Sequence, residues 1–268
     1  MKMMKPVLFW AAFMLPMFFS KANIVILNGL THHYTVEKGQ VYKGKIAVEN
    51  TSAKSQHIKL FLQDFTYSVD GTTSYTAPNS SQRTNASWIQ LNTNYVTLKG
   101  KEKAEVYYEI TVPASAGGDG SYWSVIMVEP VEDPLPGQNT TGISISSVVR
   151  YAIQIITDYR TENAKPELRF EGVKIEKKNG NSIIMVAIAN NGNLYCKPIV
   201  SIEMYHKKNG ERAGQFSTLP MGLLPQTSKL FYIDAGKVPP DRYSAVLLAT
   251  DENDNAFALN VELDIKND

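Results

Sequence analysis

The chain has 268 residues, which is long enough for a short leader and two domains of about 100–140 residues each. Its 27 Lys and Arg residues are spread along the sequence and nearly balance 26 Asp and Glu residues. Because nucleic-acid-binding proteins concentrate basic residues in a patch, this distribution argues against a nucleic-acid partner. Cys196 is the single cysteine and cannot form an intrachain disulfide, so we expect it to be a small core residue.

The first 22 residues have the layout of a secretory signal peptide. Lys2 and Lys5 precede an apolar run, and small residues occupy the first and third positions of Ser20-Lys21-Ala22. The apolar run from Pro6 to Phe19 is shorter than the ~20 residues that a membrane-spanning helix needs. We therefore predict cleavage after Ala22, a periplasmic or secreted location, and no integral membrane segment in the mature chain.

Beyond the leader, apolar and polar residues alternate with the period of β-strands, and no long amphipathic helix is indicated. We expect strands at 41–49, 57–67, 87–91, 95–97, 104–112, 121–129 and 143–157, and then at 168–176, 182–189, 198–206, 213–217, 228–233, 242–249 and 256–264. Short strands at this spacing, separated by Gly, Asn and Asp turns, are typical of immunoglobulin-like (Ig-like) β-sandwiches. The predicted fold is therefore all-β.

The two halves of the sequence repeat one pattern. Residues 46–51 resemble residues 186–191, and Val112-Pro113 corresponds to Val238-Pro239. The repeat is longer than the units of about 20–50 residues that build solenoids, so it indicates two copies of a small domain. We predict a signal peptide over 1–22, an Ig-like β-sandwich over 23–160, a polar linker at 161–165 and a second Ig-like β-sandwich over 166–268.

Each Val-Pro pair is followed by a tyrosine that enters a late strand after a tight turn. Tyr122 and Tyr243 occupy the place of the tyrosine corner of Ig-like sandwiches, where the hydroxyl bonds back to the main chain. Ser124 and Ala245 stand where antibody domains have a cysteine. We therefore expect a relative of the antibody fold without the disulfide.

The sequence contains no motif of a known catalytic or nucleotide-binding site, so we predict a non-enzymatic protein without a cofactor. His32 and His33 are adjacent and would point to opposite faces of a strand, which disfavours a metal site. Residues 251–262 imitate a calcium loop, but Ala256 replaces the glycine that the turn requires. We expect that segment to be a polar hairpin tip and predict no metal site.

Two tryptophans leave two interpretations open. Trp88 and Trp123 lie on predicted strands, where large aromatic residues usually pack in the core or between sheets. The alternative is that they form a surface on which a glycan stacks. This alternative corresponds to a secreted adhesion or a module that binds cell wall or glycan.

The first half carries Gly44-x-Ile46-x-Val48-x-Asn50, then Trp88-Ile89, and then the Val112-Pro113 strand end. A Gly-x-Tyr strand at 120–122, a long loop and a long last strand follow. This order resembles the first domain of periplasmic pilus chaperones and, about equally, the Ig-like domain of WxL-interacting cell-surface proteins. The resemblance implies a non-enzymatic protein that binds another protein, such as a pilus or surface subunit, during periplasmic or cell-surface assembly.

The strand expected at 143–157 is the candidate partner site, because it exceeds the usual strand length of about 5–6 residues. Its first half would project beyond the sandwich and offer an edge for strand addition. The predicted partner-binding residues are Ile143, Ile145, Val149 and Arg150. The alternative is that this half forms a hairpin with 121–129 and is covered within the chain.

Overall fold

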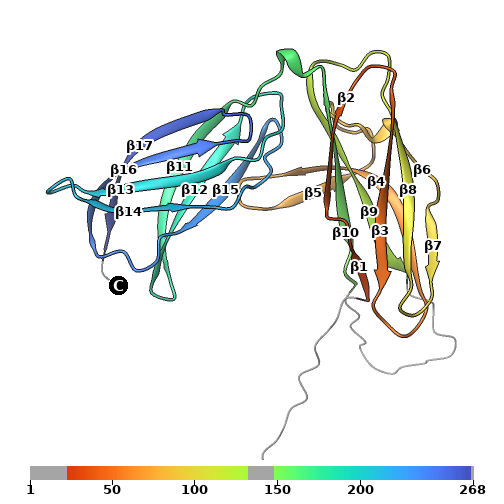
Figure 1. The fold of residues 1–268 in the computed structure, drawn as a ribbon, viewed down its shortest axis with the longest axis horizontal. Coiled ribbons are helices and arrows are strands. Elements are labelled where there is room, and N and C mark those ends of the chain that lie inside the picture. Colours follow the sequence, from red (N-terminus) through yellow and green to blue (C-terminus); the bar gives the residue numbers. More distant parts are fainter. Residues whose placement is uncertain (1–22, 132–147, 267–268) are drawn as a thin grey trace, which may run out of the picture.

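The computed structural model describes residues 23–131 and 148–266, and it shows an all-β protein made of two β-sandwiches (Figure 1). The first sandwich contains β1 (Ile24–Ile26), β2 (Thr31–Val36), β3 (Val41–Asn50), β4 (Gln56–Tyr67), β5 (Thr73–Thr76), β6 (Ile89–Leu91), β7 (Tyr95–Leu98), β8 (Lys103–Thr111), β9 (Gly120–Val131) and β10 (Tyr151–Tyr159). The second contains β11 (Leu168–Lys178), β12 (Asn181–Asn190), β13 (Ile199–His206), β14 (Arg212–Ser217), β15 (Thr227–Asp234), β16 (Asp241–Thr250) and β17 (Ala256–Ile265). The predicted fold class is thus confirmed.

Each sandwich consists of two sheets. In the first sandwich one sheet has the order β1-β3-β8-β6, and the other has the order β2-β10-β9-β4-β5 with β7 also paired to β4. The second sandwich pairs a β11-β12-β15 sheet with a β14-β13-β16-β17 sheet. Among the described strand pairs, β2 with β10 is parallel and the others are antiparallel. Short 3₁₀ turns occur at η1 (Ala86–Trp88) and η2 (Thr161–Asn163).

The structure corrects several expected strand positions. β1 and β2 were not expected, because residues 24–36 lack a clear alternation of apolar and polar side chains. The strand expected at 143–157 is β10, which begins at Tyr151 and continues to Tyr159. Residues 148–150 precede it without strand structure, and residues 143–147 lie outside the described part of the chain.

The repeated Asn50 and Asn190 perform the same task in the two sandwiches. Both side chains are buried, and their amide groups donate to backbone carbonyls, that of Leu98 at 3.2 Å and that of Leu223 at 3.4 Å. In each copy the side-chain oxygen also accepts the N–H group two residues later at 3.0 Å. Buried backbone groups without hydrogen-bond partners would destabilise the fold. In each sandwich this asparagine supplies partners for loop N–H and C=O groups that the sheets leave unpaired.

The tyrosine corners are confirmed in both copies. The Tyr122 hydroxyl donates to the Gly118 carbonyl at 2.7 Å, and the Tyr243 hydroxyl donates to the Pro239 carbonyl at 2.7 Å. Each bond spans four residues and fixes the turn that leads into β9 or β16. The sequence repeat therefore corresponds to repeated hydrogen bonds as well as to repeated strands.

Other local predictions are also confirmed. Cys196 is buried, and burial raises the pKa of its thiol to about 12. The Asp251 carboxylate accepts the N–H groups of Asn253 and Asn255, which closes the polar hairpin between β16 and β17. Glu262 lies away from this turn and pairs with Lys207 at 2.6 Å.

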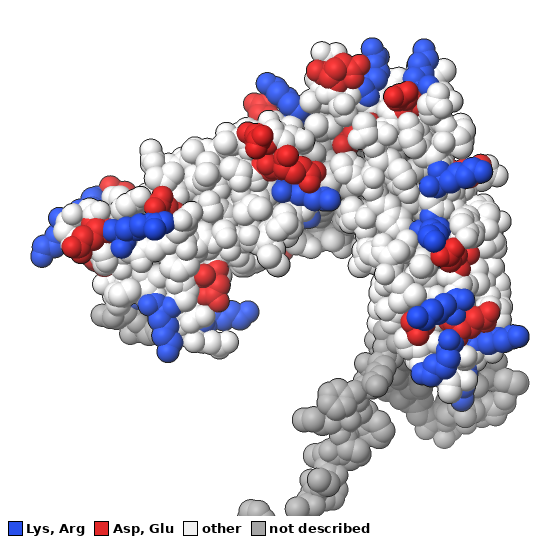
Figure 2. Space-filling view, in the orientation of Figure 1, with Lys and Arg blue, Asp and Glu red and all other residues white. Residues whose placement is uncertain are grey.

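The charged side chains on the face shown in Figure 2 are scattered, and both signs occur on each domain. On the outer side of β3 and β8, Lys45 lies 2.7 Å from Glu105 and Lys43 lies 3.2 Å from Glu109. Such exposed pairs contribute little to stability and are typical of a solvated face. No helix in residues 23–131 and 148–266 is long and apolar enough to cross a membrane.

Candidate partner-binding site

The outward side of the second sheet in the first sandwich faces the other domain. We define the elbow face by the outward side chains Lys59 and Phe61 of β4, Val125, Met127 and Glu129 of β9, and Ala152 and Ile156 of β10. Strand register aligns Phe61 with Met127 and Met127 with Ala152, so these three side chains form an apolar row across the sheet. Met127 is buried, whereas Phe61 and Ala152 are half-buried and border solvent.

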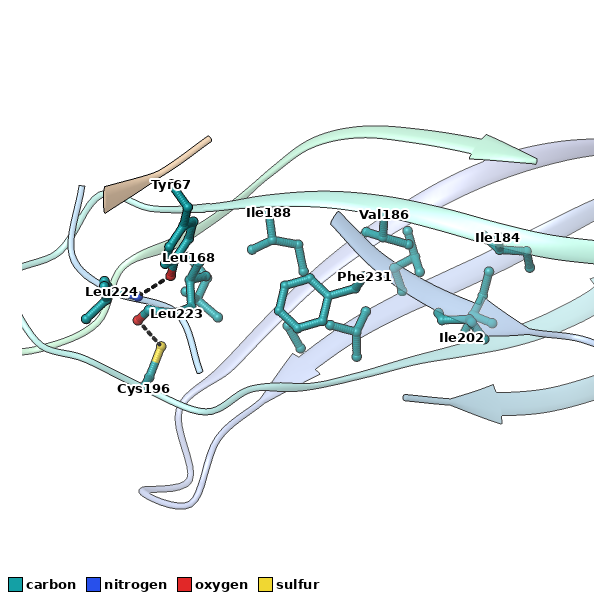
Figure 3. Close-up of a cluster of buried hydrophobic side chains, with 14 of the residues drawn as sticks. Tyr67, Leu168, Ile184, Val186, Ile188, Cys196, Ile202, Leu223, Leu224 and Phe231 are labelled. Atoms are coloured by element: carbon teal, nitrogen blue, oxygen red, sulfur yellow. Dashed lines mark hydrogen bonds between the residues drawn. The ribbon is translucent and has the colours of Figure 1, made fainter. Parts of the chain in front are cut away.

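The second domain covers one end of this sheet. Tyr67 reaches from the end of β4 into the second domain, where its hydroxyl accepts the Leu224 N–H at 2.9 Å (Figure 3). The Trp123 indole N–H donates to the Phe65 carbonyl at 2.7 Å, and Trp123, Val125 and Tyr67 belong to the same buried cluster as the second-domain core. The two sandwiches therefore share an apolar seam.

This seam decides between the two interpretations of the tryptophans. Trp123 is buried in the shared cluster. Trp88 is also buried, and its ring centre lies 4.9 Å from the ring centre of Tyr122. Both are packing residues, which confirms the default interpretation and excludes the alternative of a glycan-stacking surface built on them. Packing was the expected default for large aromatic residues on strands.

A polar network ties the seam to β2 and β10. Asp158 on β10 is buried, accepts the Ser121 hydroxyl at 2.5 Å and lies 2.6 Å from His33 Nε2. The Tyr195 N–H of the second domain donates to the Ser121 hydroxyl oxygen at 2.7 Å. His32 instead lies 2.6 Å from the Tyr108 hydroxyl, so the two adjacent histidines face opposite sides as expected.

The far end of the elbow face is charged. Arg150 lies 3.5 Å from Glu129, and the Lys59 ammonium lies 5.4 Å from the centre of the Phe61 ring. The Arg150 side chain is exposed and that of Glu129 is half-buried, so solvent screens the ion pair and it contributes little stability. The face thus changes from buried apolar residues at the seam to exposed charges at the opposite end.

The outer edge of β10 is only partly occupied. β9 pairs with all of Tyr151–Tyr159, whereas β2 pairs with the other edge from Gln154 to Tyr159. The Gln154 N–H donates to the Leu30 carbonyl at 2.9 Å, which shows that this residue points its backbone groups to the β2 side. Alternate residues of an antiparallel strand point the same way, so the Ala152 N–H and C=O face the open side. No described strand pairs with them.

Exposed apolar residues lie on the segments that precede β2 and β10. The chain crosses from β1 to β2 through residues 27–30, where Leu27 and Leu30 are 46% and 47% exposed. Val149 precedes β10 and is 46% exposed. The sequence reasoning missed Leu27 and Leu30. The Asn28-Gly29 pair could have indicated a turn between two exposed leucines. The structure shows such a turn conformation, because Gly29 has a φ of 86°.

The structure brings two of the four predicted site residues to this edge. Val149 and Arg150 lie directly before the open part of β10. Ile143 and Ile145 lie outside the described residues, so their role and the proposed projection of the strand stay predictions. The Tyr151 hydroxyl donates to the Ile24 carbonyl at 2.7 Å and fixes the start of β10 against β1.

No protein-family model matches the chain, and no curated protein matches it. Among solved structures, the class 5 fimbriae chaperone CfaA has a TM-score of 0.46 and 15% identity, over 89% of this chain and 98% of that one. The YadV chaperone has a TM-score of 0.41 and 13% identity, over 90% and 100%. A chain of the Salmonella enterica SafA pilin–SafB chaperone complex has a TM-score of 0.42 and 7% identity, over 91% and 98%. At these identities the likeness concerns the two-domain fold.

Proposed function

We propose that this chain is an exported, non-enzymatic protein that binds another protein by strand addition at the open edge of β10. The observation that carries the proposal is the outward N–H and C=O of Ala152, which have no partner among the described strands and lie beside the point where β2 stops covering β10. An unpaired strand edge exposes donors and acceptors that a partner strand can satisfy. Its role would be chaperone-like, during periplasmic or cell-surface assembly.

The surroundings of the edge suit an apolar partner strand. In strand addition, main-chain hydrogen bonds supply affinity and alternate side chains supply specificity. Leu27, Leu30 and Val149 are exposed on the segments that precede β2 and β10, and such a strand would cover them. Complete burial of a side chain of this kind contributes roughly 1.5–3 kcal/mol, so partial cover of three residues would add substantially to binding.

The first partner to test is a pilin-like or other surface subunit. SafA is a pilin in complex with a chaperone in one of the structures compared above. The elbow face continues from the edge as the row of Phe61, Met127 and Ala152, and it ends at the charges of Glu129 and Arg150. A partner that fits would therefore have an alternating apolar strand beside a surface with mixed charges.

Replacement of Ala152 by proline tests the edge directly. Proline removes one N–H, and at this position that N–H has no described partner within the chain. We expect the Ala152→Pro variant to keep its melting temperature within ~4 °C, the shift that about 1 kcal/mol causes at this size. Capture of the subunit should fall at least about tenfold.

The matched control is Ala152→Ser, which keeps the N–H and a small side chain and should capture the subunit normally. Capture at full strength by the proline variant would overturn the proposal. A subunit that is captured equally well by the serine and proline variants would show that it binds elsewhere on the protein.

A further inference from the structure

A cavity of 240 Å³ lies at the seam, between the β4–β5 turn of the first domain and β15 of the second. Figure 1 shows β5 reaching toward β15 across the junction of the two sandwiches. Tyr67 and Asp70 line the cavity from the first domain, and Lys229 and Tyr232 line it from the second. The cavity therefore exists only when the two domains are docked.

Lys229 and Asp70 are the charged residues of this cavity, and Lys229 is the more buried of the two. Its ammonium donates to the Gly222 carbonyl at 2.5 Å and lies 4.3 Å from the centre of the Tyr67 ring. It forms no ion pair with a described carboxylate, and burial lowers its pKa from the ordinary value. An ammonium has three donors, so one is left for the cavity after these two contacts. Asp70 lines the same cavity but lies beyond ion-pair distance of this half-buried ammonium, so an anionic group of a ligand would compensate the charge.

The remaining walls are amphipathic. Tyr232 is 59% exposed, and with Val69 and Leu230 it forms an apolar side of the cavity. Ser68 and Asp70 add a hydroxyl and a carboxylate at the β4–β5 turn. This combination matches a pyranose ring, because the ring has an apolar C–H face and a rim of hydroxyl groups. Few polar groups at fixed positions within an apolar pocket are typical of small-molecule sites.

A second hollow extends the cavity. It has a volume of 510 Å³ and shares Val69, Asp70, Leu230 and Tyr232 with the first. Its other wall is the outer side of β11 and β12, where a β-bulge lies between Phe170 and Gly172. A Cβ at Gly172 would meet no atom within 4 Å, so this part of the hollow is open. The two hollows together have room for more than one sugar unit.

We propose that the seam cavity binds a carboxylate-bearing sugar, with Lys229 pairing with the carboxylate and Tyr232 covering the C–H face of the ring. The ligand class is a hexuronate, either free or as a unit of an acidic glycan chain. This site is separate from the strand-addition edge and depends on both domains. A glycan contact of the protein would thus use tyrosine and lysine at the seam and no tryptophan.

The test is calorimetric titration of the exported full-length chain with glucuronate, with glucuronamide as the uncharged ligand of the same shape, and with short oligouronates. Glucuronate should bind more tightly than glucuronamide by about tenfold, the scale of one charge-assisted hydrogen bond. Tighter binding of oligouronates would identify an acidic glycan as the source, and equal binding would identify a free acidic sugar. Either result supports the site.

Three variants complete the experiment. Lys229→Gln should abolish the preference for glucuronate, and Lys177→Gln, at an exposed lysine outside the cavity, should keep it. Because Lys229 also contacts Tyr67 at the seam, Tyr232→Ser is the variant that leaves the seam intact, and it should weaken both ligands. Equal binding of glucuronate and glucuronamide to the unmodified chain overturns the proposal. So does the absence of binding by glucuronate and oligouronates alike.

Discussion

β10 and β17 are the last strands of their sandwiches, yet they present different edges. β17 pairs with β16 along all of Ala256–Ile265 and has no described strand on its other side. It carries the acidic side chains of Glu262 and Asp264 along this edge. Charged residues on an edge strand discourage pairing with another chain, so β17 has the features of a protected edge.

The open part of β10 lacks this protection. Tyr151, Ala152 and Ile153 carry no charge, and β2 covers the same edge only from Gln154 onward. The exposed Leu27 and Leu30 lie beside it. The comparison shows that the last strand carries charged side chains at its unpaired edge in one copy and none at its unpaired stretch in the other. The unpaired stretch of β10 arises because the chain before β2 crosses between the sheets at residues 27–30.

The largest effect is expected from Asn85, which fixes β9 and β10 in the first sandwich. Among the described residues, no buried asparagine does the same beside β16 and β17. Its buried amide donates to the Ile155 carbonyl at 3.0 Å and to the Thr157 hydroxyl at 3.1 Å, and its oxygen accepts the Ser124 hydroxyl at 2.6 Å. Asn85→Ala leaves several buried polar groups unpaired, so the free energy of unfolding should fall by about 3 kcal/mol or more. Urea denaturation measures this, and a loss below about 1 kcal/mol would contradict it.

The next effect concerns the two edges themselves. Leu30→Ser should reduce capture of the partner by about tenfold, because an exposed side chain beside the binding edge is lost. Leu259→Ser, at a partly exposed leucine on β17, is the matched control and should leave capture unchanged. Surface plasmon resonance with the purified subunit measures both. Equal losses would show that the two edges are not different.

The thiol of Cys196 lies in the second sandwich, within the buried cluster that both sandwiches share. Burial raises its pKa from 9.0 to about 12, so the folded state disfavours the thiolate and the unfolded state does not. This contribution to stability is complete below pH 9.0 and is lost as pH rises toward 12. Between pH 8 and 10 the chain should lose about 1.4 kcal/mol more than its Cys196→Ala variant. Denaturation curves at both pH values test this, and parallel losses would contradict it.

The smallest effect is expected from Tyr67→Phe at the seam. The ring and its contact with Lys229 remain, and the hydrogen bond from the Leu224 N–H is lost. The free energy of unfolding should fall by about 1 kcal/mol. Thermal unfolding followed by calorimetry measures the loss. Separation of one transition into two would show that this single bond couples the domains, which would make the seam weaker than its apolar cluster indicates.

Local patterns in the sequence predicted much of the fold. The alternation of apolar and polar residues gave most of the strands, and the Asn50–Asn190 and Tyr122–Tyr243 correspondences located equivalent loops and corners. These features depend on near neighbours along the chain and on a period of two residues. The short strands β1 and β2 were missed for two reasons: β1 has only three residues, and β2 consists mainly of polar residues, so neither shows an apolar–polar alternation.

The candidate sites could be predicted only in part. Val149 and Arg150 were identified from the length of an apolar alternation, and both lie beside the open edge of β10. Leu30 became part of this site only because β2 pairs in parallel with β10, which no local pattern indicates. Lys229 and Asp70 are far apart in sequence, and the seam brings them to one cavity.

The sequence by itself determined an all-β chain with two similar units. Strand period, turn residues and the repeat can be recognised from residues that are close together in the sequence. The tertiary structure decided where one edge stays open and where the two units meet. Both depend on contacts between residues more than a hundred positions apart, such as Tyr67 with Leu224 and His33 with Asp158. Packing and hydrogen bonding select these contacts from many that the sequence pattern allows, because each must bury apolar surface and satisfy the polar groups beside it.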